Sequence, residues 1–372
     1  MRLHSTFLIL LIAPLIAAAA PAPAEKRMVL IDQDGSGPGG SNQMAMMVLL
    51  QSPEVDVLGI TMVTGNAWRD AEAAHTLRML ELIGRSDVPV ALGAVFPLVR
   101  TQEETRLATA LVGQVGWLGA WGERPTDTAN ADRPPPPGPY FVGPLPEGAP
   151  HTAPIAEDAA HFLIRQVHAH PHEVTVYAAG PMTDIAIAVS IDPHFAELTR
   201  GIVMMGGSLD PQTEDPEFST SPRHEFNFWF DPEAARIVLR APWPRIDLTT
   251  VDVSIKAMFS QAMLDEIAKS ATPAARYVAN YSQERYYLWD ELAACAWLDP
   301  GIITETRDLY MDVDVGHGPA YGETLTWSKA FKPAIDLQLV HAQVDLDLPR
   351  FARMFVALMS APTPPARKTS GK

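Results

Sequence analysis

Two carboxylates one residue apart mark the part of the chain where chemistry is expected. Asp32 and Asp34 end an apolar segment, and a glycine-rich stretch, 35–40, follows them. Side chains two positions apart on a strand face the same side, and glycine lets the backbone wrap closely round a ligand. Carboxylates placed in this way could bind a cation or take a proton from water. A simple acidic turn is the alternative interpretation.

The segments that must position these acids alternate between strand and helix patterns. Strands are expected at 28–31, 57–63, 88–92, 174–178 and 202–205, and helices at 42–50, 71–83, 155–168 and 182–189. This alternation predicts an α/β fold: a single domain with a mostly parallel, Rossmann-like central sheet flanked by helices. Sites in such sheets form beyond the carboxyl ends of the strands, where Asp32 and Asp34 are expected.

The rest of the chain adds features around this core. The stretch 122–154 is Pro-rich and predicts an inserted loop within a domain spanning 25–362; a linker between two domains is the alternative. A long helical region is expected at 274–298, broken or capped near Trp289 and Asp290. Strands and a C-terminal hairpin are expected at 309–326, and a disordered tail at 363–372.

Composition and the N-terminus limit the class of protein. Of the 372 residues, 47% are apolar, enough for a large core, and the net charge of -16 disfavours nucleic acid as a partner. Arg2, an apolar run at 7–20 and a small-residue segment at 22–24 predict a signal peptide, 1–24, and a secreted or periplasmic protein without membrane attachment after cleavage. An uncleaved anchor is the alternative. Cys295 is the only cysteine, so no intrachain disulfide can form.

Two enzyme classes begin with paired acids of this kind. The run from Asp32 to Gly35 resembles the opening motif of haloacid dehalogenase-like phosphatases, in which the first Asp attacks phosphate. Those enzymes also need a later Gly-Asp pair with further acids for magnesium, which we do not find in this sequence. The phosphatase is therefore kept as an alternative.

A second resemblance covers nearly all of 28–360. It rests on the acidic loop, 58–66 (LGITMVTGN), 179–184 (AGPMTD), 203–207 (VMMGG), 225–227 (EFN) with 231–235 (DPEAA), and 289–290 (WD). In order and spacing, these segments resemble the inosine-uridine-preferring nucleoside hydrolases. The resemblance implies calcium-dependent hydrolysis of the N-glycosidic bond of ribonucleosides, and a homo-oligomer.

The resemblance also implies roles for individual residues. Asp34 matches the family's general base and metal ligand, and Asp32 the acid just before it. The other implied calcium ligands are Asn42, the carbonyl of Thr183, and Asp290. The implied substrate-binding residues are Asp32, Ser41, Asn66, Glu225, Asn227 and Trp289. For Glu225 and Asn227, hydrogen bonding at a strand end is the alternative.

This chain departs from the family pattern at two places. Ser41 and Asn42 stand where the family has two acids, so Asn42 would offer calcium a neutral oxygen and metal binding should weaken. Trp289 stands where many members have a His, which resembles the purine-specific branch, although a core Trp is the alternative. Trp117 is a candidate for a second stacking face. The sequence thus favours an exported, purine-preferring nucleoside hydrolase; an exported nucleoside or sugar binder with weak or no catalysis is the alternative.

Overall fold

The computed structural model describes residues 26–113, 115–122, 138–219, 223–282 and 286–366. The strands within these residues form one nine-stranded sheet in the order β3-β2-β1-β4-β5-β6-β9-β7-β8. Every neighbouring pair from β3 to β9 is parallel, and β7 runs antiparallel to both β9 and β8. The strands are β1 (Arg27–Gln33), β2 (Val55–Met62), β3 (Val90–Leu92), β4 (Val174–Ala178), β5 (Gly201–Met205), β6 (Ile246–Thr249), β7 (Ile303–Val313), β8 (Thr324–Trp327) and β9 (Leu339–Leu346).

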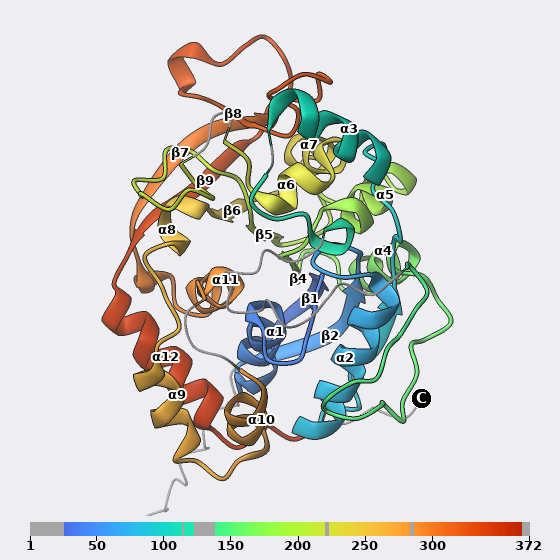
Figure 1. Ribbon diagram of the computed structural model, residues 1–372, viewed down its shortest axis with the longest axis vertical. Coiled ribbons are helices and arrows are strands. Elements are labelled where there is room, and N and C mark those ends of the chain that lie inside the picture. The colour runs from blue at the N-terminus through green and yellow to red at the C-terminus, as the bar shows by residue number, and fades with distance from the viewer. Residues whose placement is uncertain (1–25, 114, 123–137, 220–222, 283–285, 367–372) are drawn as a thin grey trace, which may run out of the picture.

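Helices cover both faces of this sheet (Figure 1). They are α1 (Ser41–Gln51), α2 (Arg69–Ile83), α3 (Gln102–Val112), α4 (Ala159–Ala169), α5 (Thr183–Ile191), α6 (Phe226–Phe230), α7 (Pro232–Arg240), α8 (Val251–Ser254), α9 (Gln261–Ala268), α10 (Pro273–Tyr281), α11 (Trp289–Leu298) and α12 (Leu348–Ser360), with short 3-10 turns at Gly119–Trp121, Pro300–Ile302 and Lys329–Phe331. The predicted α/β fold with a mostly parallel, flanked sheet is confirmed.

Strand β1 shows how the two layers of helices are held. Val29 and Ile31 are buried against α1, α2, α11 and α12, whereas Leu30 is buried with α4, α5 and α7 on the other face. A parallel strand covered on both sides has a continuous apolar run instead of an alternating pattern, as Met28 to Ile31 of β1 have. Each face has its own cluster of buried side chains, so the sheet lies between two hydrophobic cores.

Helix α1 is the most enclosed helix at the site. From Asn42 to Gln51 every one of its residues is buried, which is the pattern of a helix surrounded by protein on all sides. It packs against α11 and α12, and its first turn starts directly after the glycine-rich loop. Gly39 in that loop has a φ of +75°, and a Cβ there would meet the backbone of Tyr281 at 2.4 Å, so the loop fits only with glycine.

Several predicted boundaries change in the structure. The expected long helical region at 274–298 is two helices, α10 and α11, and α11 begins at Trp289, where a break was expected. The expected hairpin is present as β7 and β8, and a further strand that was not expected, β9, pairs with β7 on its other side. Helix α3 was also missed; it carries a complete capping box, with Thr101 and Glu104 exchanging hydrogen bonds at its start.

The last part of the Pro-rich stretch packs on the domain. Residues 138–154 lie along α2, where the carboxylate of Glu147 contacts His75 and the Glu147 carbonyl accepts a 2.9 Å hydrogen bond from Arg78. Residues 123–137, the predicted signal peptide and the tail from 367 lie outside the described residues. In the part of the chain that the structure describes, no helix has the length and apolar character to cross a membrane.

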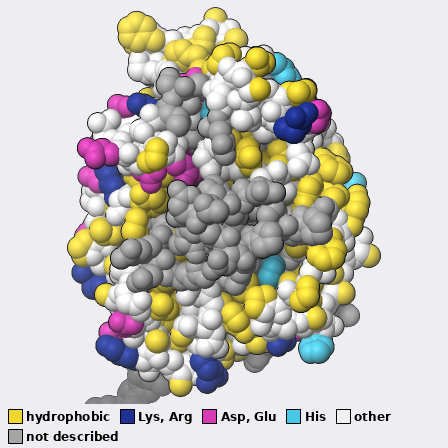
Figure 2. Space-filling view, in the orientation of Figure 1, with side chains coloured by type: hydrophobic (Ala, Val, Ile, Leu, Met, Phe, Trp, Pro, Cys, Tyr) yellow, Lys and Arg dark blue, Asp and Glu magenta, His cyan; other side chains and the backbone are white. Residues whose placement is uncertain are grey.

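Charged side chains of both signs lie on the face of the molecule drawn in Figure 2. On the face drawn in Figure 2, the Lys and Arg side chains of the described residues lie scattered around the edge, with Asp and Glu among them. Hydrophobic side chains gather at the top of that view, where Figure 1 places the loop after β8. Phe331 in this loop is 79% exposed.

Candidate active site

The candidate residues meet beyond the carboxyl ends of the central strands. β1 and β4 are adjacent, and the chain crosses to β2 on one side of them and to β5 on the other. This reversal of strand order is the topological switch point, at which the loops on either side diverge and leave room for a ligand. Asp34 follows β1, Asn66 follows β2, and Thr183 follows β4.

Asp34 is completely buried and held from two sides. Its Oδ1 atom accepts a 2.8 Å hydrogen bond from Asn42 Nδ2, and its Oδ2 atom accepts one of 2.9 Å from the backbone N–H of Asn66. A Cβ at Gly180 would lie 3.0–3.1 Å from Asp34 atoms, so the loop after β4 also packs closely on it. Asp34 is therefore fixed by three loops at once.

Asp290 is brought to Asp34 from the far end of the sequence. It lies in the first turn of α11 and is 3% exposed. Its Oδ2 atom accepts hydrogen bonds from Asn42 Nδ2 at 2.9 Å and from Gln33 Nε2 at 3.2 Å, and its carbonyl accepts one of 2.7 Å from the Tyr177 hydroxyl on β4. The predicted neighbours Asp34, Asn42 and Asp290 are thus in one cluster.

Ionisation of both clustered carboxylates is disfavoured, chiefly by burial. Burial, and then the charge of Asp290, holds the pKa of Asp34 well above its ordinary value. Burial raises the pKa of Asp290 to about 8, with Glu225 adding to the effect. A carboxylate with a raised pKa is a stronger base once ionised, which suits proton removal from water.

Asp32 has different partners from Asp34. It is completely buried, accepts a hydrogen bond from the Thr61 hydroxyl on β2, and lies close to Asp184 at the start of α5. Burial and the Asp184 charge hold its pKa well above the ordinary value. Asp32 is therefore held by β2 and α5, and its contact with substrate stays a prediction.

Ser41 joins two helices beside the cluster. Its hydroxyl donates to Glu291 and lies 3.4 Å from the backbone nitrogen of Asp290, so it links the first turns of α1 and α11, which pack directly against each other. A hydroxyl that donates its proton can still accept a hydrogen bond, so the expected contact of Ser41 with ribose stays a prediction.

Glu225 and Asn227 are engaged with the backbone. Glu225 is the N-cap of α6 and accepts hydrogen bonds of 2.8–3.0 Å from the N–H groups of Gly207, Asn227 and Phe228. Asn227 Nδ2 donates to the Met205 carbonyl at the end of β5 at 3.0 Å. These contacts match the hydrogen-bonding alternative for both residues, and their contact with ribose stays a prediction.

Thr183 reaches the same edge of the sheet but its side chain turns away. The hydroxyl donates to Asp231 at 2.7 Å. The predicted use of its carbonyl as a ligand stays a prediction.

Aromatic rings stand on the outer side of the cluster. Trp289, directly before Asp290, is partly buried, and its ring centroid is 5.2 Å from that of Phe218 and 4.9 Å from that of Tyr287. Trp117 is also partly exposed and donates through Nε1 to Asn66 Oδ1 at 2.7 Å. Two tryptophans thus approach the site from different segments.

Gln33 is a site residue that the sequence interpretation missed. It is completely buried and bridges the backbone N–H of Asp34, at 2.9 Å, to Asp290. A long amide between two acids at the end of an apolar strand was the available signal, because a buried amide must find partners.

The groups around Asp34 do not match the ligands of the calcium ion that the resemblance implies. Calcium needs oxygen ligands, but Asn42 presents its nitrogen to both Asp34 and Asp290. Among the described residues, no group of three or more His, Cys, Asp or Glu side chains is placed to hold a metal ion. In this arrangement the residues do not fit calcium.

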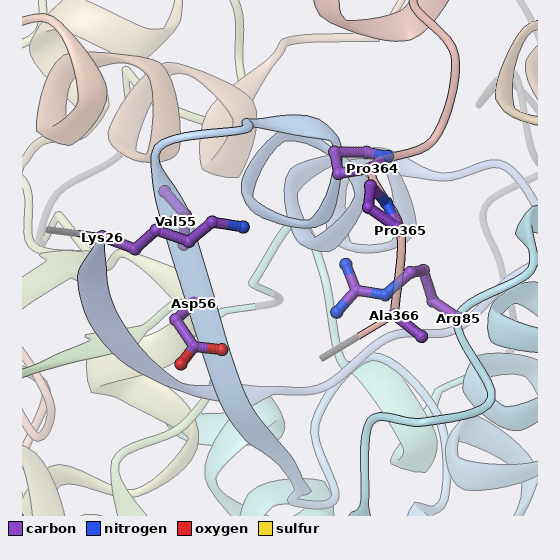
Figure 3. Close-up of a pocket in the computed structure, with 7 residues that line it drawn as sticks. All are labelled: Lys26, Val55, Asp56, Arg85, Pro364, Pro365 and Ala366. Atoms are coloured by element: carbon purple, nitrogen blue, oxygen red, sulfur yellow. The ribbon is translucent and has the colours of Figure 1, made fainter. Parts of the chain in front are cut away.

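A separate cavity lies at the amino ends of the strands, away from Asp34. It has a volume of about 290 Å³ and is lined near the starts of β1 and β2 by Lys26, Val55, Asp56, Arg85 and residues 364–366. Lys26 and Arg85 extend into it from opposite sides (Figure 3). Because it lies at the amino ends of the strands, it is not part of the cluster around Asp34.

Comparison with solved structures identifies the fold. The fold matches a purine-preferring ribonucleoside hydrolase from Gardnerella vaginalis with a TM-score of 0.68 and 22% identity, covering 90% of this chain and 98% of that one. It matches a plant nucleoside hydrolase with a TM-score of 0.68 and 23% identity, covering 90% and 99%. The fold is that of the nucleoside hydrolases.

The sequence comparison gives the family. The family model for inosine-uridine preferring nucleoside hydrolases matches residues 29–353, and this chain belongs to that family. It is 30% identical over 300 residues to a probable uridine nucleosidase 2 of Arabidopsis thaliana, covering 77% of this chain and 82% of that protein. It is 32% identical over 251 residues to a pyrimidine-specific ribonucleoside hydrolase of Citrobacter koseri, covering 68% of each. Family membership removes the phosphatase alternative.

Proposed function

We propose that this protein hydrolyses the N-glycosidic bond of ribonucleosides to free base and ribose, with Asp34 as the general base. The observation that carries this is the buried Asp34 carboxylate, which the loops after β1, β2 and β4 hold at the switch point of the sheet. Asp34 takes a proton from water, and the water oxygen bonds to the anomeric carbon. The bond to the base breaks, and the base leaves with its electron pair and takes a proton from solvent.

The residues on the outer side of Asp34 are those available to the nucleoside. Asn66 is partly exposed, donates through its N–H to Asp34, and carries a side-chain amide that can bond to ribose hydroxyls. Trp289 and Trp117 offer apolar faces for the base.

We further propose that purine nucleosides are preferred. The support is the cluster of Trp289, Phe218 and Tyr287, because a bicyclic purine gains more from stacking than a pyrimidine. Relatives in this family carry both names, uridine nucleosidase and purine-preferring hydrolase, so inosine and uridine are the discriminating substrates.

The proposed reaction does not use calcium, the cofactor that the resemblance implies. Asn42 turns a nitrogen toward Asp34 and Asp290, whereas calcium takes oxygen ligands.

The test is release of free base from inosine, guanosine, uridine and cytidine, followed by chromatography. We expect base release, faster from the purine nucleosides, and a loss of about 10²–10⁴-fold in Asp34→Asn, the range for a general base. The hydrolase is excluded if the folded protein releases no base from the whole panel, or if Asp34→Asn keeps full activity.

A binding protein is the second candidate. It is favoured by Asn42, whose amide already occupies one oxygen of Asp34. Calorimetry that detects nucleoside binding, together with an absence of base release over hours, would support binding without catalysis.

We also propose export, on the basis of the N-terminal segment 1–24, and a homo-oligomer, as the resemblance implies. Mass spectrometry of the mature protein from a host with a secretion pathway tests the first. Light scattering of the purified protein tests the second.

A further inference from the structure

A single nitrogen atom lies where the two carboxylates of the site converge. Asn42 Nδ2 is 2.8 Å from Asp34 Oδ1, 2.9 Å from Asp290 Oδ2 and 3.0 Å from Gln33 Oε1. Asn42 is 8% exposed, and the other three residues are at most 3% exposed. A point surrounded by oxygens from two buried acids is where a cation would be expected, and here an amide NH₂ group fills it.

The orientation of the Gln33 amide is fixed by the backbone N–H of Asp34. The backbone N–H of Asp34 lies 2.9 Å from Gln33 Oε1 and can only donate. The oxygen of Gln33 must therefore face it, and Gln33 Nε2 must face Asp290 Oδ2. The atom of Asn42 that lies beside Gln33 Oε1 must also be nitrogen, because two carbonyl oxygens would repel each other.

The indole N–H of Trp117 supports the same orientation of Asn42 through Asn66. The indole Nε1 of Trp117 donates to Asn66 Oδ1 at 2.7 Å, and an indole N–H can only donate. Asn66 therefore presents its Nδ2 atom to Asn42, whose Oδ1 lies 3.4 Å away. Turning the Asn42 oxygen toward the carboxylates would break contacts at both ends of this chain of hydrogen bonds.

We propose that Asn42 and Gln33 form an amide clamp that holds Asp34 and Asp290 together in place of a cation, so that this protein assembles its site without calcium. Asparagine and aspartate have the same shape, but asparagine brings two N–H bonds where aspartate would bring a third negative charge. With aspartate at position 42, three buried carboxylates would meet and would need a cation to stay ionised.

The test measures calcium binding directly and does not depend on activity. The full-length protein, treated with chelator and dialysed, is titrated with CaCl₂ in a calorimeter beside Asn42→Asp. We expect no binding to the unchanged protein up to about 1 mM, the weak end of protein calcium sites, and binding at least about tenfold tighter by Asn42→Asp. Asn280→Asp, which adds the same charge on the exposed side of α10, is the control and should bind none.

Thermal unfolding provides a second measurement of calcium binding in case Asn42→Asp is too unstable for calorimetry. We expect the midpoint of the unchanged protein to be the same in chelator and in calcium, and that of Asn42→Asp to rise by several degrees in calcium. The proposal is overturned if the unchanged protein binds one calcium per chain below about 1 mM or loses stability in chelator, or if folded Asn42→Asp binds none. Base release is assayed separately. A protein that releases no base could still have the amide clamp, and a protein that binds calcium could still be a hydrolase.

Discussion

Gly65 leaves no space for a side chain beside Asp34. A Cβ at position 65 would lie 2.1 Å from Asp34 Oδ2 and 2.7 Å from the ring of Pro181. The next residue, Asn66, donates its backbone N–H to the same Oδ2 atom at 2.9 Å. The loop after β2 therefore comes close enough to fix the carboxylate only because residue 65 is glycine.

Gly65→Ala should displace Asp34 and lower kcat. The added methyl group and the carboxylate cannot occupy the same space, and a shift of about 1 Å in a catalytic group costs on the order of 10²-fold in rate. The control is Gly40→Ala in the neighbouring loop, where a Cβ meets nothing within 4 Å. Steady-state kinetics on both variants is the measurement, and equal rates for the two would contradict the proposed position of Asp34.

Trp289→Ala should raise KM for inosine. Stacking of one base on an aromatic side chain is worth about 1–3 kcal/mol, or about five- to hundredfold in affinity. Trp297→Ala is the matched control, because it removes the same ring from the other end of α11, where Trp297 contacts Arg27. If the two variants have the same KM for inosine, Trp289 does not contact the base.

Glu225→Ala should lower the free energy of unfolding by about 3 kcal/mol. Three backbone N–H groups would lose their acceptor in a buried position, beyond the usual cost of an N-cap of about 1 kcal/mol. Thr272→Ala, which removes the ordinary N-cap of α10, should cost about 1 kcal/mol. Urea denaturation measures both, and an equal cost for the two variants would show that Glu225 is no more than a simple cap.

The pH dependence of stability should carry a contribution from His224. Burial, and then the charge of Arg100, lowers the pKa of His224 from 6.5 to about 4. Between these values the unfolded chain binds a proton at this residue that the folded chain does not. The contribution to stability is therefore present above pH 6.5 and is lost as the pH falls toward about 4.

The size of this effect can be isolated by comparison with His224→Phe. Allowing for partial exposure, the unchanged protein should lose about 2 kcal/mol relative to this variant across that pH range. Urea denaturation at several pH values gives the difference. A difference that stays constant with pH would show that His224 is protonated equally in both states.

Much of the fold was predictable because its signals are local. The apolar runs of β1, β2, β4 and β5, and the helical periods between them, identify a parallel sheet with covered faces. Helix α3 was missed although its capping box is present in the sequence, and β9 was missed because its pairing with β7 and β6 is not visible locally.

The sequence by itself determined that Asp34 lies at the end of a first parallel strand, and that Asn42 and Asp290 belong to the same site. Only the tertiary structure decided what these groups present to each other. The oxygen and the nitrogen of an amide have nearly the same shape, so only the neighbouring groups decide which way the amide faces. The neighbours of Asn42 come from the end of β1, the loop after β2 and the start of α11. Likewise, Ser41 donates to Glu291 because α1 packs against α11, a contact between segments about 250 residues apart.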